Sequence, residues 1–289
     1  MKVSGVSFIK NAIKYDYPIK EALQSILPIC DEVVVAVGQS EDNTRELVKS
    51  IDPKIKIIDT MWDETLREGG RVLADETNKA LKSVSKDSDW IFYIQGDEVI
   101  HEKYHDAVVK GMKSNMDNDQ VNGLLFKYLH FYGSYEFIGA SSNWYAHEIR
   151  VIKNDPSIYS YRDAQGFRMK NNKKLKVKEI DAYIYHYGWV KDPRAMQGKM
   201  ETFNKLYHDD EWMEKNIVKR DSFDYSFINA LNRFEESHPE VMKDRILSKN
   251  WAFDFDPSFN KFKFKDKVKK LIEKYLHIRL GYKNYTRLK

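Results

Sequence analysis

Hydrophobic residues in the first hundred positions alternate between short β-branched or aromatic runs and stretches with helical spacing. The short runs predict strands at residues 3–9, 32–37, 54–60 and 90–94. The stretches between them predict helices at residues 18–27, 41–51 and 71–84, with Pro18 in the first turn of one and Ser40 capping the next. Strands and helices that alternate over such short connections indicate an α/β fold, with a mostly parallel central sheet flanked by helices.

Later residues are less regular. The pattern predicts a helix at 101–116, strands at 123–131, 149–153 and 182–187, and helices at 193–208 and 223–236. From Lys265 onward, apolar residues share one face of a predicted amphipathic helix with lysines opposite: Val268, Leu271, Ile272, Tyr275, Leu276 and Leu280. We expect a core over residues 1–215 and a helical C-terminal extension with a basic amphipathic tail over residues 216–289.

Charge is concentrated at the C-terminal end. The chain has a net charge of +4, but residues 261–289 hold eleven Lys and Arg against two acids, which is +9 and leaves about −5 for the rest. Three roles are open for this tail: packing on the body, contact with an anionic membrane, and self-association. No nucleic-acid partner is expected.

Cysteine content and hydropathy bear on the compartment. Cys30 is the single cysteine, so no disulfide can form within the chain. The N-terminal apolar run is too short for a signal peptide, and no stretch approaches roughly 18 consecutive apolar residues. These features predict a cytoplasmic protein, which would be peripheral on the inner face of the membrane if the tail contacts it.

The segment from Asp89 to Glu98 has the clearest chemical character. A run of bulky apolar residues, typical of a buried strand, ends in the adjacent carboxylates of Asp97 and Glu98. Open α/β sheets bind ligands at the carboxyl ends of their strands. Two carboxylates there can hold a divalent cation, and the cation can hold a diphosphate. The alternatives are an acidic surface turn or, for Asp97, a cap for the next helix.

Four segments in chain order resemble the inverting family 2 glycosyltransferases, which have a GT-A fold. Val6 to Asn11 resembles the family's first strand and nucleotide-facing turn, and Gly38 to Thr44 resembles the end of its D-D-G-S-x-D-x-T segment. Gly69-Gly70 with Asn78 resembles its G…R-N-x-G region, and Ile94 to Glu98 resembles its L-D-x-D-D metal motif. The resemblance covers roughly residues 3–190 and implies a GT-A fold for the core.

Two departures from the family pattern affect the expected chemistry. Val37 and Gly38 stand where the family's second segment opens with two acids, so the base of the donor is not predicted. Gln95 replaces the first acid of the metal motif, and an amide offsets no charge. The missing acids leave open a degenerate domain that binds nucleotide or glycan without turnover.

The resemblance implies a nucleoside diphosphate-sugar donor. The candidate nucleotide-sugar-binding residues are Phe8, Asn11, Gly38, Asp42, Arg71, Asn78 and Gln95. Asp97 and His186 are the candidate ligands of a Mg²⁺ or Mn²⁺ ion that would offset the charge of the leaving diphosphate, although His186 also suits a hydrogen-bonded core position. Arg67 and Arg150 are further candidates for the diphosphate, with solvated surface charge as the alternative.

Inversion by direct displacement needs a general base for the acceptor hydroxyl. Asp163, between two late strands, is the first candidate, and Glu148 is its rival. Both also suit the role of an ordinary surface or ion-paired acid. Two aromatic side chains, Trp144 and Tyr145, suit either stacking on a sugar or ordinary packing.

Together these features predict a metal-dependent glycosyltransferase of the hexosyltransferase type. It would transfer a sugar, with inversion, to a hydroxyl of a surface or cell-envelope glycan, free or lipid-linked. One alternative is a nucleotidyltransferase, although the glycine-rich loop usual after its first strand is missing from Phe8 to Tyr15. The other is the degenerate binding domain.

Overall fold

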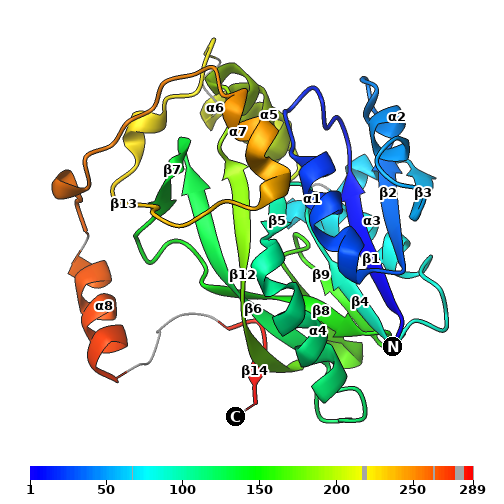
Figure 1. The fold of residues 1–289 in the computed structure, drawn as a ribbon. Helices are drawn as coiled ribbons and strands as arrows, with labels where there is room; N and C mark the ends of the chain where they lie inside the picture. Colours follow the sequence, from blue (N-terminus) through cyan, green and yellow to red (C-terminus); the bar gives the residue numbers. More distant parts are fainter. Residues whose placement is uncertain (67, 217–219, 263, 277–282, 289) are drawn as a thin grey trace.

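The computed structural model describes residues 1–66, 68–216, 220–262, 264–276 and 283–288. Within these residues an eleven-stranded central sheet runs through the molecule, with helices against it (Figure 1), and a three-stranded sheet is separate from it. The predicted α/β class, with a central sheet flanked by helices, is confirmed.

The elements of the first half lie close to their predicted positions, and the second half adds further strands. The strands are β1 (Val3–Ile9), β2 (Glu32–Gly38), β3 (Ile55–Thr60), β4 (Trp90–Tyr93), β5 (Glu98–Ile100), β6 (Gly123–Tyr132), β7 (Ser134–Gly139), β8 (His147–Lys153), β9 (Ile158–Tyr161), β10 (Gly166–Met169), β11 (Lys173–Lys174), β12 (Lys176–Trp189), β13 (Leu231–Arg233) and β14 (Thr286–Arg287). The helices are α1 (Ile19–Ile26), α2 (Thr44–Lys49), α3 (Arg71–Leu81), α4 (His105–Ser114), α5 (Pro193–Lys205), α6 (Asp210–Asn216), α7 (Lys243–Leu247) and α8 (Phe264–Leu276).

Four parallel strands form one half of the central sheet, in the order β3-β2-β1-β4. β4 then pairs antiparallel with β8, and the sheet continues through β6 and β7 to β13 at the other edge. The long strand β12 pairs in parallel with β6 and antiparallel with β5. The four parallel strands place their carboxyl ends at one edge, where an open α/β sheet binds its ligand.

The residues of β2 show why the parallel half is buried on both faces. Val33, Val35 and Val37 belong to one core cluster, and Val34 and Ala36 belong to the other. Helices α1, α2 and α4 contribute to the first cluster, and α3, β9 and β10 contribute to the second. A strand covered on both faces is apolar along its length, which is the pattern of β4 and of β2 after Glu32.

One predicted helix is wrong. Residues 223–236 form a 3-10 turn at Tyr225–Phe227 and the short strand β13, which pairs antiparallel with β7. Tyr225 and Leu231 pack in a mainly aromatic cluster with Tyr132 and Met196. Pairing at the edge of the sheet and this packing outweigh the helical spacing of the sequence.

The start of α2 is also corrected. The helix begins at Thr44 rather than residue 41, and Ser40 does not cap it. The Asp42 carboxylate accepts from the Thr44 N–H and Oγ instead. The Ser40 hydroxyl is turned back toward the Gly38 carbonyl, to which it donates at 2.8 Å.

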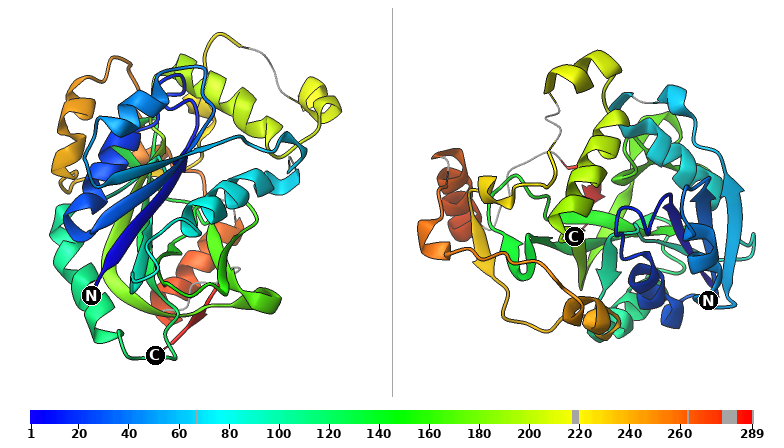
Figure 2. Two further views of the ribbon diagram at one scale, coloured as in Figure 1. Left: turned by 90° about the vertical axis from the view of Figure 1, so that its right-hand side faces the viewer. Right: turned by 90° about the horizontal axis from the view of Figure 1, so that it is seen from above.

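The C-terminal segment mixes helices and strands. β13 and β14 join the central sheet, whereas α8 stands apart from it (Figures 1 and 2). Leu280 of the predicted tail lies outside the described residues, and the boundary at residue 215 stays a prediction. In the part of the chain that the structure describes, no helix is long and apolar enough to cross a membrane.

Candidate functional site

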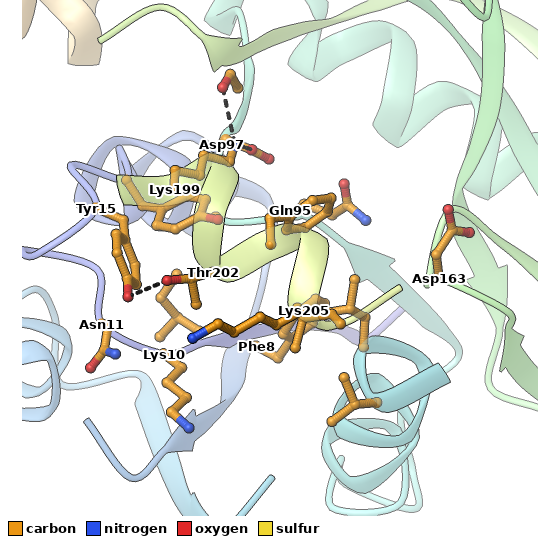
Figure 3. Close-up of a pocket in the computed structure, with 18 of the residues that line it drawn as sticks. Phe8, Lys10, Asn11, Tyr15, Gln95, Asp97, Asp163, Lys199, Thr202 and Lys205 are labelled. Carbon is orange, nitrogen blue, oxygen red and sulfur yellow. Dashed lines mark hydrogen bonds and ion pairs between the residues drawn. The ribbon is translucent and has the colours of Figure 1, made fainter. Parts of the chain in front are cut away.

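A cavity of about 1040 Å³ lies at the carboxyl ends of β1 and β4, beneath α5 (Figure 3). The loop after β1, the segment after β3 and the β9–β10 turn complete its walls. Six predicted site residues line it: Phe8, Asn11, Gln95, Asp97, Asp163 and His186. Five others do not: Gly38, Asp42, Arg71, Asn78 and Glu148.

Two of the segments that resemble the glycosyltransferase family, residues 6–11 and 38–44, are joined by hydrogen bonds beside the cavity. The Asn11 side chain accepts from the Glu41 N–H at 2.8 Å, and the Asn11 N–H donates to Ser40 Oγ at 3.0 Å. Asp42 accepts from the Lys14 N–H at 2.7 Å. Asn11 also has a positive φ of 53°, which few residues other than glycine and asparagine adopt. Asn11 and Asp42 therefore set the shape of the loop that follows β1.

Phe8 and Trp62 form an aromatic wall of the cavity. Their ring centroids are 6.2 Å apart, and Lys10 Nζ lies 5.4 Å from the centroid of Trp62. Gly38 makes room for this wall, because a Cβ at Gly38 would overlap Trp62 Nε1. An aromatic surface beside a cation suits the base and phosphates of a nucleotide.

Asp97 forms a buried ion pair with Lys199 of α5. Lys199 Nζ lies 3.0 Å from Asp97 Oδ2 and donates to the Gly188 carbonyl at 2.9 Å, and both charged residues are 9% exposed. Burial favours a raised pKa for Asp97, but Lys199 and then His186 hold its pKa well below the usual range. The next turn is capped by His101, so Asp97 is an ion-paired cavity residue and not a helix cap.

His186 on β12 lies between Asp97 and His130 of β6. His186 Nε2 is 3.8 Å from Asp97 Oδ1, and His186 Nδ1 is 3.1 Å from His130 Nδ1. Burial lowers the pKa of His186 by more than Asp97 raises it, so the imidazole is neutral near pH 7. His186 is thus both hydrogen-bonded and part of the cavity wall.

Glu98, the second acid of the segment from Asp89 to Glu98, forms an ion pair with Arg150. Arg150 Nη2 lies 2.7 Å from Glu98 Oε1, and Arg150 Nε lies 2.8 Å from Glu98 Oε2. The Tyr128 hydroxyl donates to Glu98 Oε1 at 2.8 Å. Glu98 and Arg150 are fully buried, so Arg150 is not a solvated surface charge and Glu98 is not part of the cavity.

Gln95 and Arg150 together hold the turn between β9 and β10. Gln95 Nε2 donates to the Ala164 carbonyl at 3.2 Å, and Arg150 Nη1 donates to the Gln165 carbonyl at 3.0 Å. An ionised carboxylate at position 95 could not make the first bond, because it has no proton to donate. The amide at this departure from the family pattern therefore fixes the turn that carries Asp163.

Asp163 occupies a strained turn at the cavity wall. Its neighbours Arg162 and Ala164 have φ angles of 56° and 61°, a region disfavoured for residues with a Cβ. The Tyr207 hydroxyl donates to Asp163 Oδ2 at 3.4 Å. Gly70 permits this approach, because a Cβ there would lie 2.9 Å from Asp163 Cβ. Strain of this kind persists where surrounding contacts enforce it, often in active sites.

Glu148, the rival base, lies behind the cavity wall. Its Oε2 has no hydrogen-bond partner among the described residues. Burial raises the pKa of Glu148 to about 8, with Glu98 and Asp163 adding to the increase and Arg150 opposing it. Glu148 is buried and does not line the cavity, whereas Asp163 does, so Asp163 is the better candidate.

We expect Glu148→Gln to stabilise the protein increasingly as the pH rises. The pKa of Glu148 is about 8 when folded, against an ordinary 4.5, so the folded state binds more protons than the unfolded state between these values. The free energy of unfolding then falls by up to about 1.4 kcal/mol per pH unit, and the amide removes this loss. Urea unfolding of both proteins at pH 5 and pH 8 measures the difference, and a difference that does not change with pH contradicts the assignment.

Two of the predicted donor contacts, Asn78 and Arg71, do not line the cavity. Asn78 of α3 holds β9, since its Oδ1 accepts from the Ser160 N–H at 2.7 Å and its Nδ2 donates to the Ser160 carbonyl at 3.2 Å. Arg71 is exposed, with Nη2 3.4 Å from Glu68 Oε2. Arg67 lies outside the described residues.

Trp144 and Tyr145 both contact His130. Trp144 stacks on it with ring centroids 5.1 Å apart and faces a smaller cavity of about 220 Å³. Tyr145 packs edge-on at 4.3 Å and lines the larger cavity. Of the two, Tyr145 is therefore placed to meet a sugar.

A divalent cation fits the residues around Asp97 poorly. Asp97 and His186 are metal ligands of the right kind. The Lys199 ammonium, however, lies 3.0 Å from one Asp97 oxygen and would repel a second cation. Within the described residues, no group of three or more His, Cys, Asp or Glu side chains is placed to hold a metal. The predicted Mg²⁺ or Mn²⁺ site thus has only part of a ligand set.

The sequence patterns missed the contribution of α5. Lys199 and Thr202 line the cavity, and Thr202 Oγ lies 2.7 Å from the hydroxyl of Tyr15 in the loop after β1. A signal for Lys199 was present, because it shares one helical face with Met196 and Phe203. A lysine on an apolar helical face is a candidate for a buried charge.

No protein-family model matches the chain, and no curated protein matches it in sequence. The crystal structure of S. aureus TarS is similar to it over 70% of this chain and 39% of that chain, with a TM-score of 0.44 and 18% identity. TarS 1–349 in complex with UDP-GlcNAc matches 76% of this chain and 68% of that chain, with a TM-score of 0.41 and 14% identity. Glucosyl-3-phosphoglycerate synthase from Mycobacterium tuberculosis, in complex with Mn²⁺, UDP and phosphoglyceric acid, matches 45% and 43%, with a TM-score of 0.30 and 16% identity.

Proposed function

We propose that this protein is a glycosyltransferase that moves a sugar from a nucleoside diphosphate-sugar to a hydroxyl acceptor, with inversion. The observation that carries the proposal is the convergence on one cavity of Phe8, Gln95, Asp97 and Asp163, from segments far apart in the sequence. The cavity, at about 1040 Å³, has the size of sites that enclose a small organic ligand.

The donor would lie with its base at the aromatic wall and its diphosphate toward α5. Phe8 and Trp62 offer flat surfaces to the base. Figure 3 shows Lys10, Lys199 and Lys205 on the side of the cavity away from Asp163. Positive charge on that side and a carboxylate on the other suit a leaving diphosphate and an attacking hydroxyl.

Asp163 would act as the general base. It accepts the proton of the acceptor hydroxyl as the oxygen attacks the anomeric carbon from the face opposite the diphosphate. Gln95 and Arg150 keep the turn in place, and Tyr207 orients the carboxylate. Direct displacement in this arrangement inverts the configuration at the anomeric carbon.

A panel of nucleoside diphosphates tests the donor site. A ligand at 100 times its dissociation constant stabilises a folded protein by about 2.7 kcal/mol, so at least one member of the panel is expected to raise the melting temperature clearly. Incubation with the matching sugar nucleotide and acceptor glycans should then release nucleoside diphosphate. Stabilisation by none of them contradicts the donor site, and binding without release favours a binding domain. Release of pyrophosphate from a nucleoside triphosphate and a sugar 1-phosphate, in a separate incubation, favours a nucleotidyltransferase.

We also propose that α8 places the enzyme on an anionic membrane that carries a lipid-linked glycan acceptor. Phe264, Leu271 and Tyr275 lie on one helical face and are 80%, 54% and 68% exposed. The opposite side of α8 meets the body at Ser142, which bonds to Asp266. An outward apolar stripe in a segment with a net charge of +9 suits an anionic lipid surface.

We expect Leu271→Asp to reduce sedimentation with phosphatidylglycerol vesicles. The charge would be placed within the apolar stripe, which must enter the lipid interface. Leu247→Asp is the matched control, because Leu247 is 76% exposed at the end of α7, outside the stripe. Equal binding of Leu271→Asp and the wild-type protein, or equal binding to neutral vesicles, contradicts the proposed contact.

A further inference from the structure

Lys199 brings a positive charge to the end of β4. Its ammonium group has three N–H bonds, and the contacts with Asp97 and the Gly188 carbonyl use two of them. The ion pair with the Asp97 carboxylate favours the charged ammonium, and the group lines the cavity with part of its donor capacity available.

A divalent cation and Lys199 would compete for the same carboxylate. A metal bound through both Asp97 oxygens would have to displace the ammonium from Oδ2, which lies 3.0 Å from Nζ. A metal bound through Oδ1 alone would sit beside a buried positive charge. Glu98 offers no replacement ligand, because Arg150 holds both of its oxygens.

We propose that the Lys199 ammonium, oriented by Asp97 and Gly188, binds the donor diphosphate and takes the place of a metal ion in transfer. The inference rests on the proposed glycosyltransferase function. As the bond from the anomeric carbon to the β-phosphate oxygen breaks, its electron pair passes to that oxygen beside Lys199. The acceptor oxygen forms the new bond to the anomeric carbon, and its proton passes to Asp163.

The remaining side chains fit this division of roles. Asp97 keeps Lys199 charged and in place, so it is a positioning residue for the cation. Lys10 and Lys205 lie on the same side of the cavity as Lys199 (Figure 3), so the negative charge of the diphosphate meets several cations. His186, whose Nδ1 lies 3.1 Å from His130 Nδ1 and whose Nε2 lies 3.8 Å from Asp97 Oδ1, can take part in hydrogen bonding at this end of the cavity.

The test is calorimetric binding of the best nucleoside diphosphate, with EDTA and with Mn²⁺, to the wild-type protein and to Lys199→Met. We expect the wild-type affinity to be the same in EDTA and in Mn²⁺. We expect Lys199→Met to weaken binding by about tenfold or more, the usual cost of losing a charge-assisted hydrogen bond, and Lys199→Arg to retain part of the affinity. The matched control is Lys127→Met, which removes an ammonium 2.8 Å from Asp181 outside the cavity.

The outcomes separate this inference from the proposed function. Binding that disappears in EDTA and returns with Mn²⁺ overturns the role of Lys199 but leaves the glycosyltransferase proposal standing. Equal affinity of Lys199→Met and the wild-type protein also overturns it. No binding to any nucleoside diphosphate under either condition overturns both. If Lys199→Met does not fold because Asp97 is left unpaired, the double variant Lys199→Met/Asp97→Asn removes both charges and is measured in its place.

Discussion

Replacing Asp163 with Asn is expected to lower the rate of sugar transfer by about 10²- to 10⁴-fold, the usual contribution of a general base. The amide keeps the shape of the side chain and its contact with Tyr207, but it cannot take up the proton of the acceptor. Donor affinity should be unchanged, because Asp163 lies across the cavity from Lys199 (Figure 3). Transfer rate and donor affinity are measured separately, by nucleoside diphosphate release and by calorimetry.

Glu148→Gln is the comparison variant for this experiment. It makes the same chemical change at the rival carboxyl group, which is buried and does not line the cavity. We expect it to keep most of the transfer activity. Full activity of Asp163→Asn, combined with loss of activity in Glu148→Gln, would assign the base to Glu148 instead.

Replacing Arg150 with Met is expected to destabilise the fold by about 3–5 kcal/mol. The change leaves Glu98 buried as an uncompensated charge, since both residues of the pair are fully buried. It also removes the bond to the Gln165 carbonyl, so the turn that carries Asp163 loses one of its two supports. Urea unfolding measures the stability, and nucleoside diphosphate release measures any accompanying loss of activity.

Arg194→Met provides the control for the loss of an arginine. Arg194 is exposed and pairs with Asp192 at 3.2 Å, so its removal should cost no more than about 1 kcal/mol. The double variant Arg150→Met/Glu98→Leu should recover part of the stability lost in Arg150→Met, because no buried charge remains. Equal stability of Arg150→Met and Arg194→Met would contradict the role assigned to the buried pair.

The parallel half of the sheet was predictable because its signals are local. β4 and the part of β2 after Glu32 are continuous apolar runs, and burial on both faces of the sheet requires that composition. The helix predicted for residues 223–236 was wrong because the conformation of this segment depends on partners that are distant in the sequence. These partners are the edge of β7 and the cluster around Tyr132. Pairing of this kind leaves little trace in the periodicity of a short segment.

The candidate site was predictable in position but less so in the roles of its residues. Asp97 lines the cavity, as expected for a residue at the carboxyl edge of the sheet. Asp163 also lines it, from the turn between β9 and β10 of the three-stranded sheet. The sequence could not distinguish the environments of Asp97 and Glu98, because their partners Lys199 and Arg150 lie 102 and 52 residues further along the chain. Asn78 was a predicted donor contact because its segment resembles the family's G…R-N-x-G region, and a short motif does not reveal that its side chain bonds to Ser160, 82 residues further along the chain.

A crystal structure of the protein with the nucleoside diphosphate that stabilises it most is the most direct test of the proposed donor site. We expect the base to lie against Phe8 and Trp62, and a diphosphate oxygen to lie within hydrogen-bond distance of Lys199 Nζ. A nucleotide bound outside the cavity beneath α5, or a diphosphate turned toward Asp163, would contradict the proposed donor site.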